Sequence, residues 1–232
     1  MVGNAIIDAA EKLRRTMAEV AAAMLGGGIG EIAFADGRVG TPERSASFAD
    51  VAFECWRRNV NMAADGWYAA PVTTFDENGQ GDAYAVFSYA TQVAEVEVDT
   101  ETGQVRLVRV TAVHDVGRVL NPMTLEGQIQ GGVLQGAGMA LYEKMVTDGG
   151  RIVTPDFSTY IIPTAMDVPQ IEAHFVEDPY SKGPFGAKGM GETPAMPGAV
   201  AIANAVAHAL GVRFYELPIT AEAVKRALLE KE

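Results

Sequence analysis

The sequence predicts an α+β fold, because blocks with the apolar spacing of helices alternate with blocks that read as strands. Three observations carry this prediction: an amphipathic stretch at the start, valines alternating with glutamates in the middle, and two helix-like runs at the end. The chain has 232 residues, 48% of them hydrophobic, which is ample for a core. We expect a single unit, residues 1–232, with a helical start at 4–62, a β-rich part at 83–113 and a last part at 114–232.

The helical start reads as two helices separated by a hairpin. Asn4 is the candidate cap of a first helix, whose apolar residues recur at three- and four-residue steps. Residues 31–41 suit a short hairpin that turns at Asp36 and Gly37. Ser47 is the expected cap of the second helix.

The β-rich part predicts two antiparallel strands. Valines alternate with glutamates over residues 95–98, the segment DTETG supplies a turn, and VRLVRV returns as the partner strand. A helix is expected from about 123 to 143, followed by short strands near 151–162 and 171–176.

Two further helices are expected at the end of the chain. The run 197–210 begins with proline and precedes Gly211, and almost every face of it is apolar, so we expect it to be buried. The final segment has Thr220 as its expected cap and Glu222 in its first turn.

Composition excludes several functions. Acidic residues outnumber basic ones 30 to 18, so we expect neither nucleic acid nor an anionic membrane surface as a partner. No window reaches the ~18 apolar residues of a spanning helix, and the start lacks the charge order of a signal peptide, so a cytoplasmic protein is expected. The single cysteine, Cys55, excludes an iron–sulfur cluster held by this chain alone and reads as a core residue.

The segment GPFGAKGMGETPAMPGAV, residues 183–200, surrounds one acid, Glu192, with glycines and prolines. Glycines let a ligand approach the backbone closely. The following helix would favour an ionised carboxylate through its N-terminal dipole, and Lys188 would add to that effect. Glu192 is therefore a candidate general base, and the alternative is that it serves only as a cap or dipole partner of the helix.

The segment EGQIQGGVLQGAGMALYE, residues 126–143, places Gln128, Gly132 and Gln135 close together on one helix face. Its glycines each cost up to ~1 kcal/mol of helix stability, so close packing or a ligand must hold the helix. The alternative to a ligand is glycine-mediated helix packing with the glutamines as hydrogen-bonded buried amides.

The three histidines, His114, His174 and His208, are too scattered for a metal site, and we expect no protein ligand to a metal. His208 is expected to be a hydrogen-bonded core residue. His114 is expected in a loop beside the glycine-rich helix, where it supports the site or forms an ordinary loop-stabilising hydrogen bond.

Three blocks together carry a resemblance: HDVGRVLNPMTLEGQIQGGVLQGAGMALYE, YIIPTAMDVPQIE and GPFGAKGMGETPAMPGAVAIANAVAHALGVRFYELPIT. In order and spacing they resemble the C-terminal part of the molybdenum-binding subunit of the xanthine oxidase family, the molybdenum hydroxylases. Relatives in this family include xanthine dehydrogenase, aldehyde oxidoreductase, nicotinate dehydrogenase and hydroxybenzoyl-CoA reductase. The resemblance runs from about Gly3 to Thr220 and implies antiparallel strands packed with buried glycine-rich helices, in a molybdopterin-binding fold.

The resemblance also implies roles for individual residues. Glu192 ends the Lys-Gly-x-Gly-Glu motif and corresponds to the family's catalytic base. Gln128 corresponds to the glutamine that touches the pterin, and Gly191 and Met190 are implied as further cofactor contacts, although Met190 as a core-filling residue is an equal alternative. The implied reaction is hydroxylation with oxygen from water, in which Glu192 removes a proton and the cofactor performs the redox chemistry.

The family's molybdenum subunit is much longer than this chain, so the resemblance implies a split subunit. A longer molybdenum-subunit chain would complete the site and share the molybdenum-pterin cofactor, in its dinucleotide form. FAD and iron–sulfur clusters would lie in two further partner subunits. The implied substrate is an N-heteroaromatic compound, a purine or an aldehyde. The alternatives are a non-catalytic scaffold and a subunit of the hydroxybenzoyl-CoA reductase type.

Overall fold

The computed structural model describes residues 1–231, and the chain divides into two compact units, of which the first is Met1–Ala85 and the second begins at Val86. The sequence led us to expect a single unit. The boundary lies within residues 58–89, a stretch with no helix, no strand and no buried residue. A chain without buried side chains cannot extend a hydrophobic core, which is the physical reason for the division.

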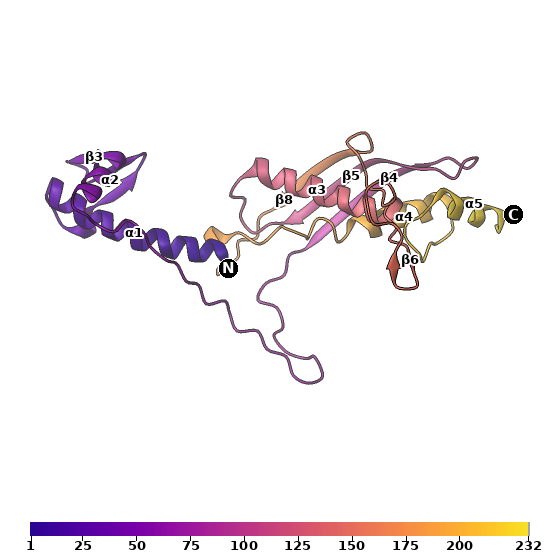
Figure 1. Ribbon diagram of the computed structural model, residues 1–232, viewed down its shortest axis with the longest axis horizontal. Helices are drawn as coiled ribbons and strands as arrows, with labels where there is room; N and C mark the ends of the chain where they lie inside the picture. The colour runs from indigo at the N-terminus through magenta and orange to yellow at the C-terminus, as the bar shows by residue number, and fades with distance from the viewer. Residues whose placement is uncertain (232) are drawn as a thin grey trace. The chain divides into compact units, whose positions relative to one another are not determined.

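The first unit contains two helices and a small sheet (Figure 1). Helix α1 spans Val2–Leu25 and therefore begins before the predicted cap, Asn4. A 3-10 turn, η1, at Ile29–Glu31 leads to an antiparallel sheet in the order β1-β2-β3, made of Ala33–Ala35, Arg38–Gly40 and Ser45–Ser47. The predicted turn is confirmed, since Asp36 and Gly37 both have positive φ.

Helix α2 spans Phe48–Arg57 and begins at the predicted cap. Ser47 Oγ accepts the Asp50 N–H at 3.0 Å, and Asp50 Oδ2 accepts the Ser47 N–H at 3.3 Å, which is a capping box. Cys55 is fully buried beside Val51 and Val39, so its prediction as a core residue is confirmed.

The second unit is built on a three-stranded sheet in the order β4-β5-β8 (Figure 1). Strands β4 (Ala90–Val98) and β5 (Val105–Asp115) form the predicted antiparallel pair. Strand β8 (Gln170–Val176) lies where a strand was expected and pairs with β5 in the parallel direction. The strand expected near 151–162 is reduced to β7 (Arg151–Ile152), which pairs with β6 (Thr147–Asp148).

Three helices complete the second unit. The glycine-rich helix α3 spans Pro122–Leu141, where Asn121 Oδ1 accepts the Thr124 N–H at 3.2 Å. Helix α4 spans Gly198–Leu210 and follows a loop that contains the short turn η2 (Pro184–Gly186). Helix α5 spans Ala221–Leu229 and is capped by Thr220, as predicted.

Helix α4 packs against α3 and β4, and only one of its faces is buried in this chain. Ile202, Val206 and Leu210 point into the core, while Val200 is 60% exposed. His208 is also exposed, so its prediction as a core histidine is wrong. The apolar composition of α4 predicted burial on nearly every face, but α3 and β4 contact the helix on one side only.

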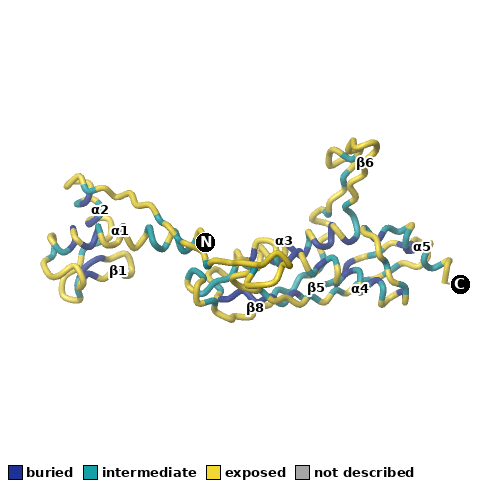
Figure 2. The backbone as a smooth tube through the Cα atoms, turned by 90° about the horizontal axis from the view of Figure 1, so that it is seen from below, coloured by how far each residue is buried: buried dark blue, intermediate teal, exposed yellow. Residues whose placement is uncertain are grey.

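The core of the second unit lies between the sheet and helices α3 and α4 (Figure 2). Val110 and Ala112 of β5 face Ile129 and Val133 of α3 in this core. No helix among residues 1–231 is long and apolar enough to cross a membrane. The α+β class predicted from the sequence is confirmed.

Candidate active site

The predicted base, Glu192, lies in the loop between β8 and α4, and a side chain of α3 is hydrogen-bonded to this loop. The side-chain amide of Gln128 on α3 donates to the carbonyl oxygen of Gly191 at 2.7 Å. The structure therefore brings together two of the residues that the sequence singled out. Glu192 follows Gly191 directly in the sequence, so this hydrogen bond holds the backbone next to the predicted base.

Glu192 lies exposed at this loop, six residues before α4 begins. Its backbone carbonyl accepts the Ala195 N–H at 3.0 Å, which turns the chain toward the helix. Among the described residues its carboxylate takes part in no ion pair. The expectation that Lys188 would support an ionised Glu192 is wrong, because the Lys188 ammonium contacts Asp115 and Asp178 instead.

Lys188 forms a nearly buried ion pair with the end of β5. Its Nζ lies 2.6 Å from Asp115 Oδ2, and the two side chains are 6% and 7% exposed. Burial alone raises the pKa of Asp115, but hydrogen bonds from Lys188 and the Gly117 N–H outweigh it, so the pKa is lowered. The hydrogen bond to Asp115 raises the pKa of Lys188 against the effect of burial.

A second polar contact holds the loop beyond Glu192. The Gln92 side-chain amide of β4 donates to the Pro194 carbonyl at 2.8 Å and lies 3.2 Å from His114 Nε2. His114 lies within β5 rather than in a loop, and it is fully buried. Burial lowers the pKa of His114, so the neutral imidazole is favoured and its Nε2 accepts from Gln92.

Met190 is buried in the hydrophobic core and is 8% exposed. Its sulfur lies 3.3 Å from Thr193 Oγ1. Of the two alternatives that the sequence left open for Met190, this placement is that of a core-filling residue.

The glycines of this region fall into two sets, which differ in their surroundings. A Cβ atom on Gly132 or Gly136 of α3 would collide with the segment 194–199, so these glycines permit close packing. A Cβ atom on any member of the second set would meet nothing within 4 Å; the set comprises Gly127 and Gly131 of α3, and Gly189 and Gly191 of the loop. We call this second set the bare glycines.

The bare glycines are exposed, as are Gln128, Gln135 and Glu192, and the hydrogen bond from Gln128 to Gly191 joins the helix to the loop. We call these residues the exposed face. Glycine inside a helix costs stability and brings no benefit where nothing packs against it in this chain. An exposed backbone with nearby amides is suited to a polar, planar ligand that approaches closely. The residues present thus fit a large cofactor at this face.

Sequence reasoning missed Gln92 and the partner of Lys188. Asp115 stands in the quoted block HDVGRVLNP, next to His114, but nothing in the local pattern distinguishes it from an ordinary loop acid. Gln92 faces the core side of a strand in which charged residues alternate outward. A polar residue at a core-facing strand position was the available signal for Gln92.

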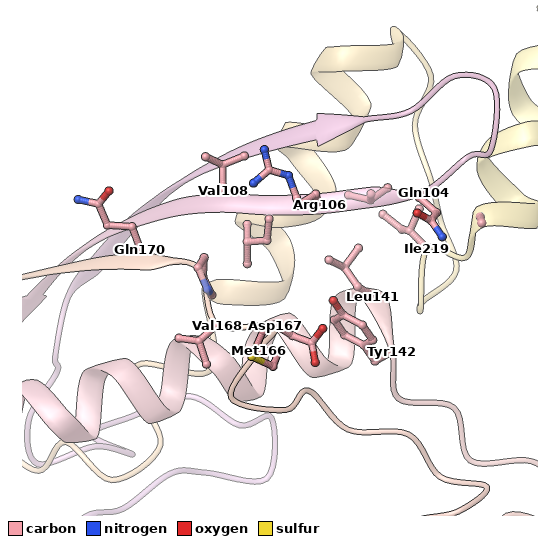
Figure 3. Close-up of a pocket in the computed structure, with 14 residues that line it drawn as sticks. Gln104, Arg106, Val108, Leu141, Tyr142, Met166, Asp167, Val168, Gln170 and Ile219 are labelled. Atoms are coloured by element: carbon pink, nitrogen blue, oxygen red, sulfur yellow. The ribbon is translucent and has the colours of Figure 1, made fainter.

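A groove of the second unit lies elsewhere. It has a volume of about 560 Å³ and lies between β5, the end of α3 and residues 166–170 (Figure 3). Leu141, Tyr142 and Ile219 are among its lining residues. Neither Gln128 nor Glu192 lines it, so this groove is separate from the candidate active site.

Comparison with known proteins identifies the family of this chain. Residues 1–169 match the family model described as a molybdopterin cofactor-binding domain. The chain is 36% identical over 236 residues to the nicotine 6-hydroxylase large subunit of Paenarthrobacter nicotinovorans, which covers 98% of this chain and 28% of that protein.

Two solved structures are similar in fold. Quinoline 2-oxidoreductase from Pseudomonas putida matches with a TM-score of 0.76 and 29% identity over 95% of this chain and 28% of that one. The aldehyde oxidoreductase from Desulfovibrio desulfuricans matches with a TM-score of 0.75 and 32% identity over 97% of this chain and 22% of that one. The chain therefore spans less than a third of the length of these relatives.

Proposed function

Because this chain belongs to the molybdopterin cofactor-binding domain family, we propose that it forms part of the molybdenum-binding subunit of a multisubunit molybdenum hydroxylase, with Glu192 as the catalytic base. The observation that supports this best is the position of Glu192. It follows Gly191, which Gln128 holds, at the edge of a face with uncovered backbone.

In this proposal the bare glycines and Gln128 hold the molybdenum-pterin cofactor. The Gln128 amide nitrogen already binds Gly191, and its carbonyl oxygen would accept from the pterin ring. When bound, the cofactor supplies the redox chemistry. The longer remainder of the subunit would provide the other cofactor contacts and cover the face, so that the cofactor, in its dinucleotide form, is shared.

Glu192 acts as an acceptor for one proton in the proposed reaction. Its carboxylate would take the proton of the water-derived hydroxyl that attacks the substrate carbon, and it would later release that proton to solvent. The carboxylate is exposed in this chain, and a base gains strength when the site excludes water. Substrate and the partner chain would supply that exclusion in the assembled enzyme.

The proposed substrate is an N-heteroaromatic compound, a purine or an aldehyde. Relatives named for nicotine, quinoline and aldehyde chemistry support this range. Electrons would leave through iron–sulfur and FAD subunits, which we propose as partners together with the longer molybdenum-subunit chain.

The replacement Glu192→Gln tests this function, because glutamine keeps the shape of the side chain and cannot accept the proton. In the assembled enzyme, turnover of nicotine, quinoline, xanthine and benzaldehyde would be assayed with a dye as electron acceptor. We expect a loss of about 10²–10⁴-fold in turnover of whichever compound reacts, with unchanged molybdenum content. The exposed acid Glu101, on the β4–β5 turn, gives the matched control Glu101→Gln, which should leave turnover unchanged.

A Glu192→Gln enzyme with unaltered turnover would contradict the proposal and support the scaffold alternative. An enzyme that reduces an aromatic thioester and oxidises none of the four compounds would instead support the reductase type.

A further inference from the structure

Three hydrogen-bonded contacts hold the loop that carries Glu192, and each comes from a different element. Lys188, four residues before Glu192, binds Asp115 at the end of β5. Gly191 binds Gln128 of α3. Pro194, two residues after Glu192, binds Gln92 of β4. The first and third contacts converge on two consecutive residues of β5, because Gln92 also contacts His114.

Every polar group of Asp115, the partner of Lys188, takes part in a hydrogen bond. One carboxylate oxygen receives Lys188 Nζ at 2.6 Å and the other receives the Gly117 N–H at 3.1 Å. The Asp115 N–H donates to the Tyr89 carbonyl at 2.8 Å, and its carbonyl accepts from Ser88 Oγ at 2.6 Å. The acid thus has little freedom to move.

The backbone of the loop also contacts the residues that follow Asp115. The Lys188 N–H donates to the Val116 carbonyl at 3.0 Å. A Cβ atom on Gly117 would lie 2.4 Å from the Gly186 carbonyl oxygen and 2.8 Å from Lys188 N. The two backbones therefore lie in direct contact, and Gly117 has the positive φ of 69° that this arrangement uses.

The contact at Gln92 is polar and partly buried. Both hydrogens of its amide group are used, one by Pro194 and one by His114 Nε2. Among the described residues, Gln92 Oε1 and His114 Nδ1 have no hydrogen-bond partner although they are buried. Unpaired buried polar atoms are costly, so packing alone does not explain why this pair is polar.

We propose that Gln92, His114, Asp115 and Lys188 form a clamp that positions Glu192 for proton transfer. The ion pair of Asp115 with Lys188 holds the loop on the N-terminal side of Glu192. The contact of Gln92 with Pro194 and His114 holds it on the C-terminal side. None of the four touches the reacting atoms, so they are positioning residues. This inference rests on the proposed role of Glu192 as the base.

Hydrogen exchange of the full chain tests the clamp without the cofactor. In Lys188→Met, which keeps the length of the side chain and removes its charge, the hydrogen-bonded amides of Ala187, Lys188 and Ala195 should exchange at least about tenfold faster. Amides of α1 in the first unit should be unchanged. The matched control is Asp178→Asn, since Asp178 is the other partner of Lys188 but is 78% exposed. Its exchange should equal that of the unaltered chain.

A second variant keeps the clamp testable if Lys188→Met fails to fold. Gln92→Met has a similar shape, removes both contacts and leaves the Lys188–Asp115 pair intact. It should accelerate exchange of the Ala195 amide, whose N–H donates to the Glu192 carbonyl. If Lys188→Met and Gln92→Met both fold and exchange the amides of the loop at the normal rate, the clamp is overturned. If only Gln92→Met folds, a normal exchange rate in that variant alone overturns it.

Kinetics of the assembled enzyme separate positioning from mere stability. Per bound molybdenum, Lys188→Met should lower kcat by about 10²-fold while KM stays within a few-fold, because a base displaced by ~1 Å still permits binding. Lys188→Arg keeps the charge and should recover part of kcat. A normal kcat per molybdenum in Lys188→Met would overturn the clamp.

The outcomes distinguish this inference from the proposed function. If Glu192→Gln retains turnover, the base assignment fails whatever the exchange data show. If Glu192→Gln is inactive while Lys188→Met keeps both its kcat and its exchange rates, the base assignment stands and the clamp fails.

Discussion

Gly132 of α3 lies so close to Pro194 that a Cβ atom on the glycine would be 2.5 Å from Cβ of the proline. The next glycine on the same face, Gly136, approaches Gly198 in the same way. Helix α3 therefore packs directly on the segment that follows Glu192. The sequence left close packing and a ligand as alternatives for what holds this helix. Gly132 and Gly136 fit close packing, whereas Gly127 and Gly131 leave room for a ligand.

Gly132→Ala should destabilise the second unit and displace the loop of Glu192. The added methyl group collides with Pro194, and overpacking of this kind typically costs about 1–3 kcal/mol. Urea unfolding of the full chain measures the change in free energy of unfolding. An unchanged unfolding midpoint would show that the loop can move away at no cost.

Gly131→Ala is the matched neighbour and should act in the opposite direction. Its Cβ meets nothing within 4 Å, so the gain in helix propensity should stabilise the chain by up to about 1 kcal/mol. If the cofactor covers the bare glycines, the same methyl group should lower the molybdenum-pterin content of the assembled enzyme. Full occupancy in Gly131→Ala would argue against cofactor contact at this face.

His114 should make the stability of the second unit depend on pH between 5 and 7. Burial lowers its pKa in the folded state, while the unfolded value is about 6.5. Below that value the unfolded chain binds more protons, so stability falls as pH falls, by up to ~1.4 kcal/mol per pH unit.

The measurement is urea unfolding at several pH values with two variants. His114→Gln should flatten the pH dependence, whereas His208→Gln should retain it because His208 is exposed. A dependence that persists in His114→Gln would assign it to another group.

The Asp115–Lys188 pair should contribute fully to stability only between about pH 5 and pH 9. The pKa of Asp115 is lowered, so its contribution is present above the unfolded value of about 3.9 and is lost as pH falls through the folded value. The pKa of Lys188 is raised, so its contribution is present below about 10.4 and is lost as pH rises through the folded value.

Asp115→Asn should therefore cost up to about 3–5 kcal/mol at pH 7, since it leaves the largely buried Lys188 ammonium with only the exposed carboxylate of Asp178 as its partner, and clearly less at pH 3. Thermal unfolding at the two pH values checks this. The exposed pair Arg106–Glu97 supplies the comparison, and Glu97→Gln should change stability little at either pH. Equal losses at pH 3 and pH 7 would contradict the ion-pair explanation.

Limited proteolysis should cut the chain between its two units. Residues 67–87 contain exposed aromatic side chains, among them Trp67 at 79% and Phe75 at 68%, and no buried residue. Brief digestion with chymotrypsin should release a C-terminal fragment that retains β4 to α5. Mass spectrometry identifies the fragment, and a cooperative thermal transition shows that it is folded. A fragment without such a transition would contradict the separation into two cores.

Elements with local signals were predictable from the sequence. The caps Ser47 and Thr220 and the turn at Asp36 were confirmed because each depends on neighbouring residues alone. The family was recognisable because the glycine-rich helix and the Lys-Gly-x-Gly-Glu motif occur together, and the family match confirms it.

Features that depend on distant residues were not predictable. Lys188 stands four residues from Glu192, yet its backbone bond to Val116 directs the side chain to Asp115. His208 lies among alanines on a helix whose buried face only packing could define. The parallel pairing of β8 with β5 likewise has no local signal.

That parallel pairing has a consequence for the order in which the chain folds. Strands β4 and β5 are joined by residues 99–104, so they meet early, whereas β8 must close a loop of residues 116–169 before it can join them. The loop of Glu192 follows β8 in the chain. We therefore expect the proposed base to reach its place only in the last, slowest step of folding, when the distant strand docks.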